Sequence, residues 1–145
     1  MGFLGYGKQG NSKALAGQQD AATRGAAIDS MVCSATGNIG FGEMVERDGL
    51  PRNVKLFDGT GTVYGITLRS DFKEQGLPGN PGAPYVPKDV VPVMRRGRVW
   101  LRTGNSGSSP LTIGAAVVGI PTSEVIDVTQ DINGDRLALV DISIP

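Results

Sequence analysis

Glycine and proline are the residues that most restrict what this chain can fold into. The sequence contains 22 glycines and nine prolines in 145 residues, well above average usage for both. Such a mixture favours strands, turns and loops over helices, because glycine weakens a helix and proline interrupts it. A chain of this length is one ordinary domain that can bury a single core. We therefore expect an all-β domain.

Alternating apolar residues predict where some of the strands lie. In residues 62–68 (TVYGITL), Tyr64, Ile66 and Leu68 share one face, which predicts a half-buried strand. The turn sequence DGTG separates this strand from residues 54–57 (VKLF) and predicts a hairpin between the two. Pro92 interrupts the apolar run VVPVM, and since proline cannot donate to a ladder, we expect that strand at a sheet edge or bulged.

A second hairpin is predicted near the end of the sequence. Residues 124–129 and 136–144 flank DINGD, in which Asn133-Gly134 is the dipeptide best suited to a tight turn with positive φ. The closing strand is expected to place four residues on its core side: Ala138, Val140, Ile142 and Ile144.

The composition divides the chain into an arm and a domain. Residues 1–27 are glycine-rich with few apolar anchors, so we expect an N-terminal arm, with one short helical turn near residues 13–22, followed by a β domain at 28–145. Because few of its residues could belong to the core, removal of residues 1–24 is expected to leave the domain folded. Within the domain, three Gly-x-Pro triplets predict an extended surface loop at residues 76–87.

The residues that are missing exclude several kinds of chemistry. The chain has no histidine, which rules out an imidazole-based triad or metal site within it. Cys33 is the only cysteine and is predicted to be a small buried strand residue. The glycines at 5, 7 and 10 match a dinucleotide-binding pattern but lack its strand and helix. We predict no catalytic, cofactor-binding or metal-binding residues, no membrane span and no secretory signal, hence a protein made in the cytoplasm.

The most conspicuous cluster is VVPVMRRGRVWLRT, residues 90–103. In the strand after Gly97, Arg98, Trp100 and Arg102 point the same way, whereas Arg95 and Arg96 are expected at a turn. Nucleic acid is a poor candidate partner, because the formal net charge is zero and the isoelectric point is about 6.2. Arginine and tryptophan are frequent at protein–protein contacts. A solvated face whose arginines pair with Asp or Glu of the same chain is the alternative. The candidate interaction residues, with the apolar residues of the arm, are Phe3, Leu4, Tyr6, Arg95, Arg96, Arg98, Trp100 and Arg102.

Four segments together resemble a known family. The order of AAIDSMVCSATGNIGFGEMV, GTVYGITL, YVPKDVVPVMRRGRVWL and DRLALVDISI is similar to the cement or decoration proteins of tailed-bacteriophage capsids, over residues 25–145. The resemblance implies a small β-sandwich or jelly-roll-like barrel on the outer capsid surface of the virion. It also implies binding to the major capsid protein, as a homodimer or homotrimer, with bridging of neighbouring capsid subunits.

Two alternatives remain open at this point. One is another structural part of the virion, such as a tail or head-completion component, which shares the same composition. The other is a trimeric dUTPase-like hydrolase, for which GNSGSSP at residues 104–110 could be the phosphate loop and Asp127 the base. The remaining motifs of that enzyme family are absent, so we predict that the chain is not an enzyme.

Overall fold

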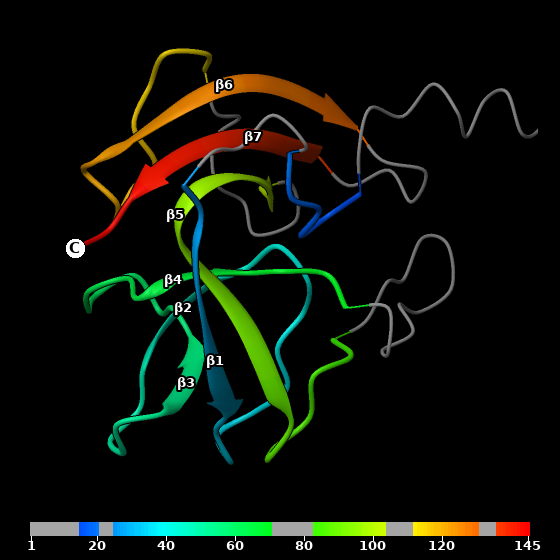
Figure 1. Cartoon of the computed structure of the whole chain (residues 1–145), viewed down its shortest axis with the longest axis vertical. Helices are drawn as coiled ribbons and strands as arrows, with labels where there is room; N and C mark the ends of the chain where they lie inside the picture. The colour runs from blue at the N-terminus through cyan, green and yellow to red at the C-terminus, as the bar shows by residue number, and fades with distance from the viewer. Residues whose placement is uncertain (1–14, 21–24, 71–82, 104–111, 131–135) are drawn as a thin grey trace, which may run out of the picture.

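A computed structural model describes residues 15–20, 25–70, 83–103, 112–130 and 136–145 (Figure 1). Within these residues the chain forms seven strands and the all-β prediction is confirmed. The strands are β1 (Ala27–Cys33), β2 (Met44–Arg47), β3 (Asn53–Leu56), β4 (Gly65–Thr67), β5 (Val90–Arg102), β6 (Ser123–Gln130) and β7 (Arg136–Ser143).

Five strands close into a barrel. Their order is β1-β3-β2-β4-β5, and an antiparallel pairing of β1 with β5 completes the ring. The barrel is mixed, because β1 and β3 run parallel while the other neighbours are antiparallel. β7 pairs with β5, and β6 pairs with the other edge of β7. These two strands therefore extend the sheet beyond the barrel (Figure 1).

β5 belongs to both parts of the fold. Its residues 90–96 pair with β1, and residues 96–102 pair with β7. Gly97 lies at the start of the half that pairs with β7 and has φ of 132°, a conformation that side-chain-bearing residues rarely adopt. Figure 1 shows β5 bending between the barrel and the β7–β6 ribbon. The turn predicted at Arg95 and Arg96 is therefore wrong: both residues lie inside this continuous strand, because glycine allows the strand to bend without ending.

The strand bends allow the chain to bury two apolar clusters. The first gathers Met31, Cys33, Ile39, Phe41, Val45, Val54, Tyr64, Tyr85, Val91, Val93, Trp100, Leu137 and Leu139, together with Ala16. The second gathers Val63, Ile66, Leu68, Met94, Val99, Leu101, Val117, Ile120, Val125, Ala138, Val140 and Ile142. Successive residues of β5 and β7 enter different clusters, so both faces of these strands are buried. The four predicted core-side residues of the last strand agree with this, since three are buried and Ile144 packs against the second cluster.

The first predicted hairpin is wrong. β3 pairs with β2 and β1, while β4 pairs with β2 and β5, so β2 lies between the two segments expected to pair. The local hairpin is instead β2–β3. Residues 63–68 are buried on both faces and not on one, because the barrel wall at β4 is covered by the second cluster. The predicted pairing of the last two strands is confirmed as β6–β7, and its turn lies outside the described residues.

Residues 15–20, which the sequence assigned to the arm, lie against the body of the fold. Gly17 donates its backbone N–H to the carbonyl of Trp100 (2.9 Å), and the Trp100 N–H donates to Gln18 (3.0 Å). Ala16 is buried in the first cluster. These residues form a turn and a bridge to β5, and no helix. Removal of residues 1–24 would expose this part of the core, and folding of the domain without them stays a prediction.

Candidate interaction surface

The arginines and the tryptophan after Gly97 occupy different environments. Arg98 lies 3.6 Å from the Asp141 carboxylate, in an exposed pair, and Arg102 lies 3.5 Å from Glu43 with only 13% of its side chain exposed. Trp100 is buried in the first cluster at 6% exposure. The pairing of both arginines within the chain is what the solvated-face alternative predicts. Trp100 packs in the core of this chain, and its contact with a partner stays a prediction.

Arg96 and Arg95 also differ in how far they are exposed to solvent. Arg96 is exposed, opposite Ser143 of β7 and Ala27 of β1. Arg95 is half-buried: its guanidinium lies 4.0 Å from the centroid of the Tyr64 ring and donates to the main-chain oxygen of Pro145. Of the five candidates on β5, Arg96 is exposed and Arg98 keeps 39% of its side chain accessible, whereas Trp100 and Arg102 are largely buried.

A second arginine also lies against the ring of Tyr64. The Arg47 guanidinium lies 5.0 Å from the ring centroid, and the Tyr64 hydroxyl donates to the carboxylate of Asp29. These residues border a cleft of about 480 Å³, lined by Glu46, Arg47, Thr62, Val63, Tyr64, Arg95, Ile144 and Pro145. Sequence reasoning missed this site. Arg47 carries no local signal, and both arginines reach the Tyr64 ring only through the long-range pairings of β2, β4 and β5.

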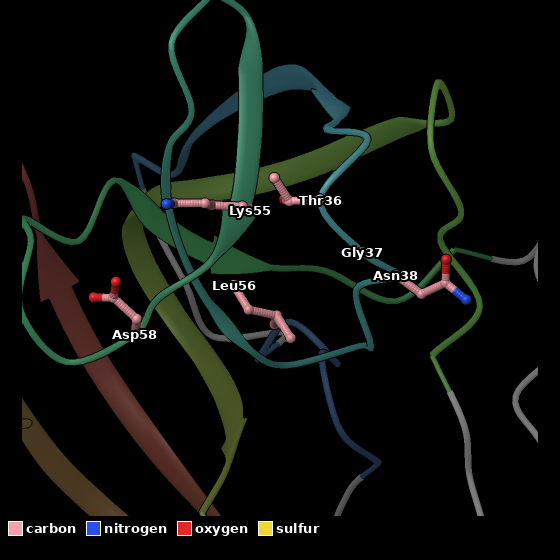
Figure 2. Close-up of a pocket in the computed structure, with 6 residues that line it drawn as sticks. All are labelled: Thr36, Gly37, Asn38, Lys55, Leu56 and Asp58. Carbon is pink, nitrogen blue, oxygen red and sulfur yellow. The ribbon is translucent and has the colours of Figure 1, made fainter.

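A second, smaller hollow of about 220 Å³ lies between the loop after β1 and the strand β3 (Figure 2). Thr36, Gly37 and Asn38 come from the loop, while Lys55, Leu56 and Asp58 come from β3 and the residues that follow it. Two of its charged groups are already engaged. Lys55 pairs with Glu46 at 3.7 Å, and Asp58 accepts hydrogen bonds from Thr60. The hollow therefore offers little free polar chemistry.

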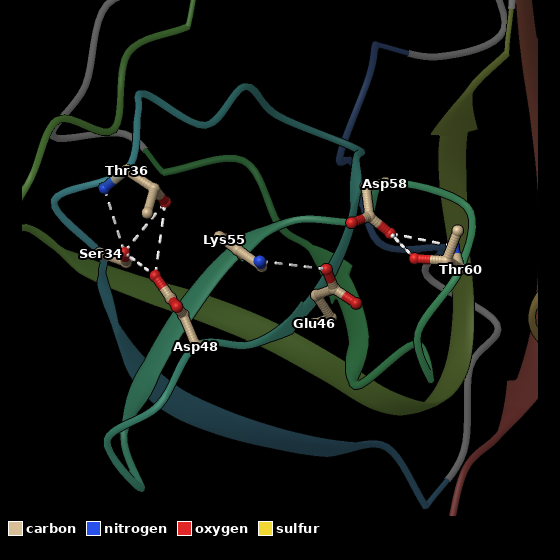
Figure 3. Close-up of polar contacts among 7 residues, drawn as sticks. All are labelled: Ser34, Thr36, Glu46, Asp48, Lys55, Asp58 and Thr60. Atoms are coloured by element: carbon tan, nitrogen blue, oxygen red, sulfur yellow. Dashed lines mark hydrogen bonds and ion pairs between the residues drawn. The ribbon is translucent and has the colours of Figure 1, made fainter.

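Figure 3 shows that the hydroxyl and carboxylate groups around this hollow bind one another. The Ser34 hydroxyl donates to Asp48 and lies 3.0 Å from the hydroxyl of Thr36. Thr60 donates its backbone N–H (2.9 Å) and hydroxyl (2.7 Å) to Asp58, and these hydrogen bonds lower the pKa of the Asp58 carboxyl. A serine bound to a carboxylate without an imidazole base lacks the activation of a nucleophile, so these contacts order the loops.

The single cysteine is buried, as predicted. Cys33 is 2% exposed and its thiol donates to the carbonyl of Gly37 at 3.2 Å. Burial, with a smaller contribution from the nearby charge of Asp89, raises the pKa of the Cys33 thiol. The thiol is therefore protonated near neutral pH and packs as a small apolar residue.

Several sequence predictions lie outside the described residues. These are Phe3, Leu4 and Tyr6 of the arm, the loop at 104–110 and most of the Gly-x-Pro loop. Where that loop re-enters the described chain, Tyr85 is fully buried and pairs with Ile39, so this end of the predicted surface loop belongs to the core. Asp127, the base of the hydrolase alternative, lies in β6, and its carboxylate accepts a hydrogen bond from the N–H of Val128.

The described residues contain no group of three or more cysteine, aspartate or glutamate residues that could hold a metal ion. No helix among them is long and apolar enough to cross a membrane.

A family model described as "Structural cement protein (E217 gp24/Pam3 gp6)" matches residues 4–136. No curated protein matches the chain. The matched range begins well before residue 25, where the resemblance in the sequence began, and it therefore includes most of the predicted arm.

Proposed function

The chain belongs to the phage structural cement protein family, and we propose that it binds the outer surface of an assembled capsid and bridges neighbouring major capsid protein subunits. The length of the family match carries this proposal. Residues 4–136 include β1 to β6 entirely and reach the first residue of β7. A structural cement protein acts by binding, which implies a role without enzymatic turnover.

The solvent-facing arginines of β5 support a contact with the capsid. Arg96 is exposed, and 39% of the Arg98 side chain remains accessible beside Asp141. Arginine forms strong, forked hydrogen bonds to carboxylates, and many copies on a lattice can each bind weakly and still remain attached. We assign capsid contact to these two residues, with Phe3, Leu4 and Tyr6 of the arm as further candidates. Arg102 and Trp100 support the surface from inside the fold.

Attachment to empty capsids tests the proposal. The variant Arg96→Ala/Arg98→Ala should reduce occupancy on purified empty capsids several-fold, because truncating interface arginines commonly costs about 1–4 kcal/mol. The control is Arg136→Ala, since Arg136 is also exposed but lies at the far end of β7 from Arg96. Binding should also weaken as salt rises from roughly 0.05 to 0.5 M.

Three outcomes of this assay would count against parts of the proposal. A wild-type protein that binds isolated tails and not capsids would favour the tail or head-completion alternative. Wild-type occupancy by the double variant at both salt concentrations would move the contact away from β5. Sedimentation of the free protein as a monomer at the concentrations used would argue against the homodimer or homotrimer that we propose on the family resemblance.

A further inference from the structure

Two cations, Arg47 and Arg95, border the cleft beside Tyr64. Arg47 and Arg95 both lie over the Tyr64 ring, and cation–π attraction of this kind is worth about 0.5–1 kcal/mol at exposed sites. The hydrogen bond to Pro145 holds Arg95 further. The two guanidinium groups therefore lose little freedom when a ligand binds them.

Carboxylates of the chain close to this cleft are bound by other groups. Asp29 accepts the hydrogen bond of the Tyr64 hydroxyl. Glu46 pairs with Lys55 (Figure 3), and its carboxylate packs so closely on Gly61 that a Cβ there would lie 2.1 Å from Oε2. Among the described residues, no ion pair joins Arg47 or Arg95 to an Asp or Glu side chain. Arg95 has the main-chain oxygen of Pro145 as its hydrogen-bond acceptor, and in that part of the chain neither arginine is paired with an Asp or Glu side chain.

The remaining wall of the cleft is mixed: it contains Thr62, Glu46, whose carboxylate pairs with Lys55, and three apolar residues. The apolar residues are Val63, Ile144 and Pro145, and the cleft volume of about 480 Å³ lies within the range of ligand-binding pockets. Arginine binds a carboxylate through two parallel hydrogen bonds, and adjacent apolar residues suit the neighbouring side chains of a peptide. A phosphate ion would bind the two arginines but would make no favourable contact with these apolar residues.

We propose that this cleft binds an acidic peptide segment of a partner protein, whose carboxylate pairs with Arg47 and Arg95. The site is separate from Arg96 and Arg98, and the inference does not depend on capsid attachment. It assigns a function to two residues that sequence reasoning did not connect.

The test uses the full-length protein and a short synthetic peptide that carries two glutamates among alanines and valines. A matched peptide has glutamine at both positions. In calorimetric titrations at low salt, the acidic peptide should bind about tenfold more tightly than the glutamine peptide, because a charge-assisted pair is lost in the latter. Arg47→Gln and Arg95→Gln should each weaken acidic-peptide binding about tenfold. Arg47→Lys should lie between, since lysine keeps the charge but cannot form the forked pair.

The control variant is Arg136→Gln, which should bind the acidic peptide like the wild type. Equal affinity for the two peptides would overturn the proposal whatever the variants do. Unchanged binding by Arg47→Gln, or tighter binding of inorganic phosphate than of the peptide at equal ionic strength, would overturn it as well. None of these results would affect the capsid assay, so the two proposals fail independently.

Discussion

At the scale of single residues, Tyr85 supplies a hydrogen-bond donor that Pro92 lacks. Leu68 donates its N–H to the carbonyl of Pro92 (2.9 Å), as expected of a hydrogen-bonded pair between antiparallel strands. Proline cannot return the bond. The carbonyl of Leu68 instead accepts the hydroxyl of the fully buried Tyr85 at 2.6 Å. This is why Pro92 is tolerated in the central strand β5, although the sequence predicted an edge strand or a bulge.

Replacing Tyr85 tests this compensation. Tyr85→Phe should lower the free energy of unfolding by about 1–3 kcal/mol, because a buried carbonyl loses its donor. In that background, Pro92→Ala supplies an N–H to Leu68 and should recover about 1 kcal/mol, whereas in the wild-type background it should recover nothing. Denaturant unfolding of the four proteins measures the coupling. An identical effect of Pro92→Ala in both backgrounds would mean that the two residues act independently.

The same tyrosine predicts a loss of stability in alkali. Burial raises the pKa of Tyr85 from 10.0 to about 12, partly opposed by the positive charge of Arg69. Below pH 10 the phenol is protonated in both the folded and the unfolded chain, so its contribution to stability is complete. As the pH rises from about 10 to 12, the unfolded chain ionises first and the contribution is lost. Unfolding measured across this range should show a steeper decline for the wild type than for Tyr85→Phe.

At the scale of elements, close backbone contacts hold residues 15–20 against the barrel. Gly17 has φ of 76°, and a Cβ built on it would lie 2.7 Å from the backbone nitrogen of Arg69 and 2.9 Å from that of Gly42. Gly42 has φ of 67° and comes as close to Gly17 and to the carbonyl of Trp100. Only glycine fits at either position, so this part of the arm folds with the domain.

Two glycines allow the contact to be separated from backbone strain. Gly17→Ala should destabilise the protein by about 2–5 kcal/mol, the sum of about 1–2 for the positive φ and about 1–3 for the overlap. Gly25→Ala is the matched control, because Gly25 has φ of 64° but no atoms within 4 Å of an added Cβ. It should cost only the strain, about 1–2 kcal/mol. Equal midpoints of thermal unfolding for the two variants would show that residues 15–20 do not pack as described.

The sequence predicted the elements whose pairing is local. The β6–β7 hairpin was found because Asn133-Gly134 favours one tight turn between two apolar runs. The pairing partners of β4 were not predicted, because β4 pairs with β2 and β5 only when the barrel closes. The candidate site shows the same limit. The arginines of β5 were visible as a cluster, but the burial of Trp100 and the meeting of Arg47 with Arg95 depend on contacts between distant strands.

At the scale of the whole molecule, one strand joins the two parts of the fold. β5 pairs with β1 and β4 in the barrel and with β7 in the extension. It also supplies Val93 to the first cluster and Val99 to the second. Neither cluster can be lost without exposing a face of β5, so the barrel and the extension should unfold together.

This coupling predicts one transition. Val45→Ala weakens the first cluster and Val140→Ala weakens the second, and both side chains are 0% exposed. Each substitution should cost roughly 2 kcal/mol and shift a single common midpoint. Calorimetry checks this, because the measured enthalpy should equal the enthalpy derived from the shape of the transition. Two separated heat-absorption peaks in either variant would show that the barrel and the β7–β6 extension are independent units.

Because of its position, Trp100 is an intrinsic fluorescent probe of one contact in the fold. It is the only tryptophan of the chain, its backbone binds Gly17 and Gln18, and it shares a cluster with Ala16. All indole fluorescence therefore originates at the point where residues 15–20 meet the barrel. Because indole emission shifts to longer wavelength when water reaches the ring, release of this segment would be visible in the emission spectrum without any added dye.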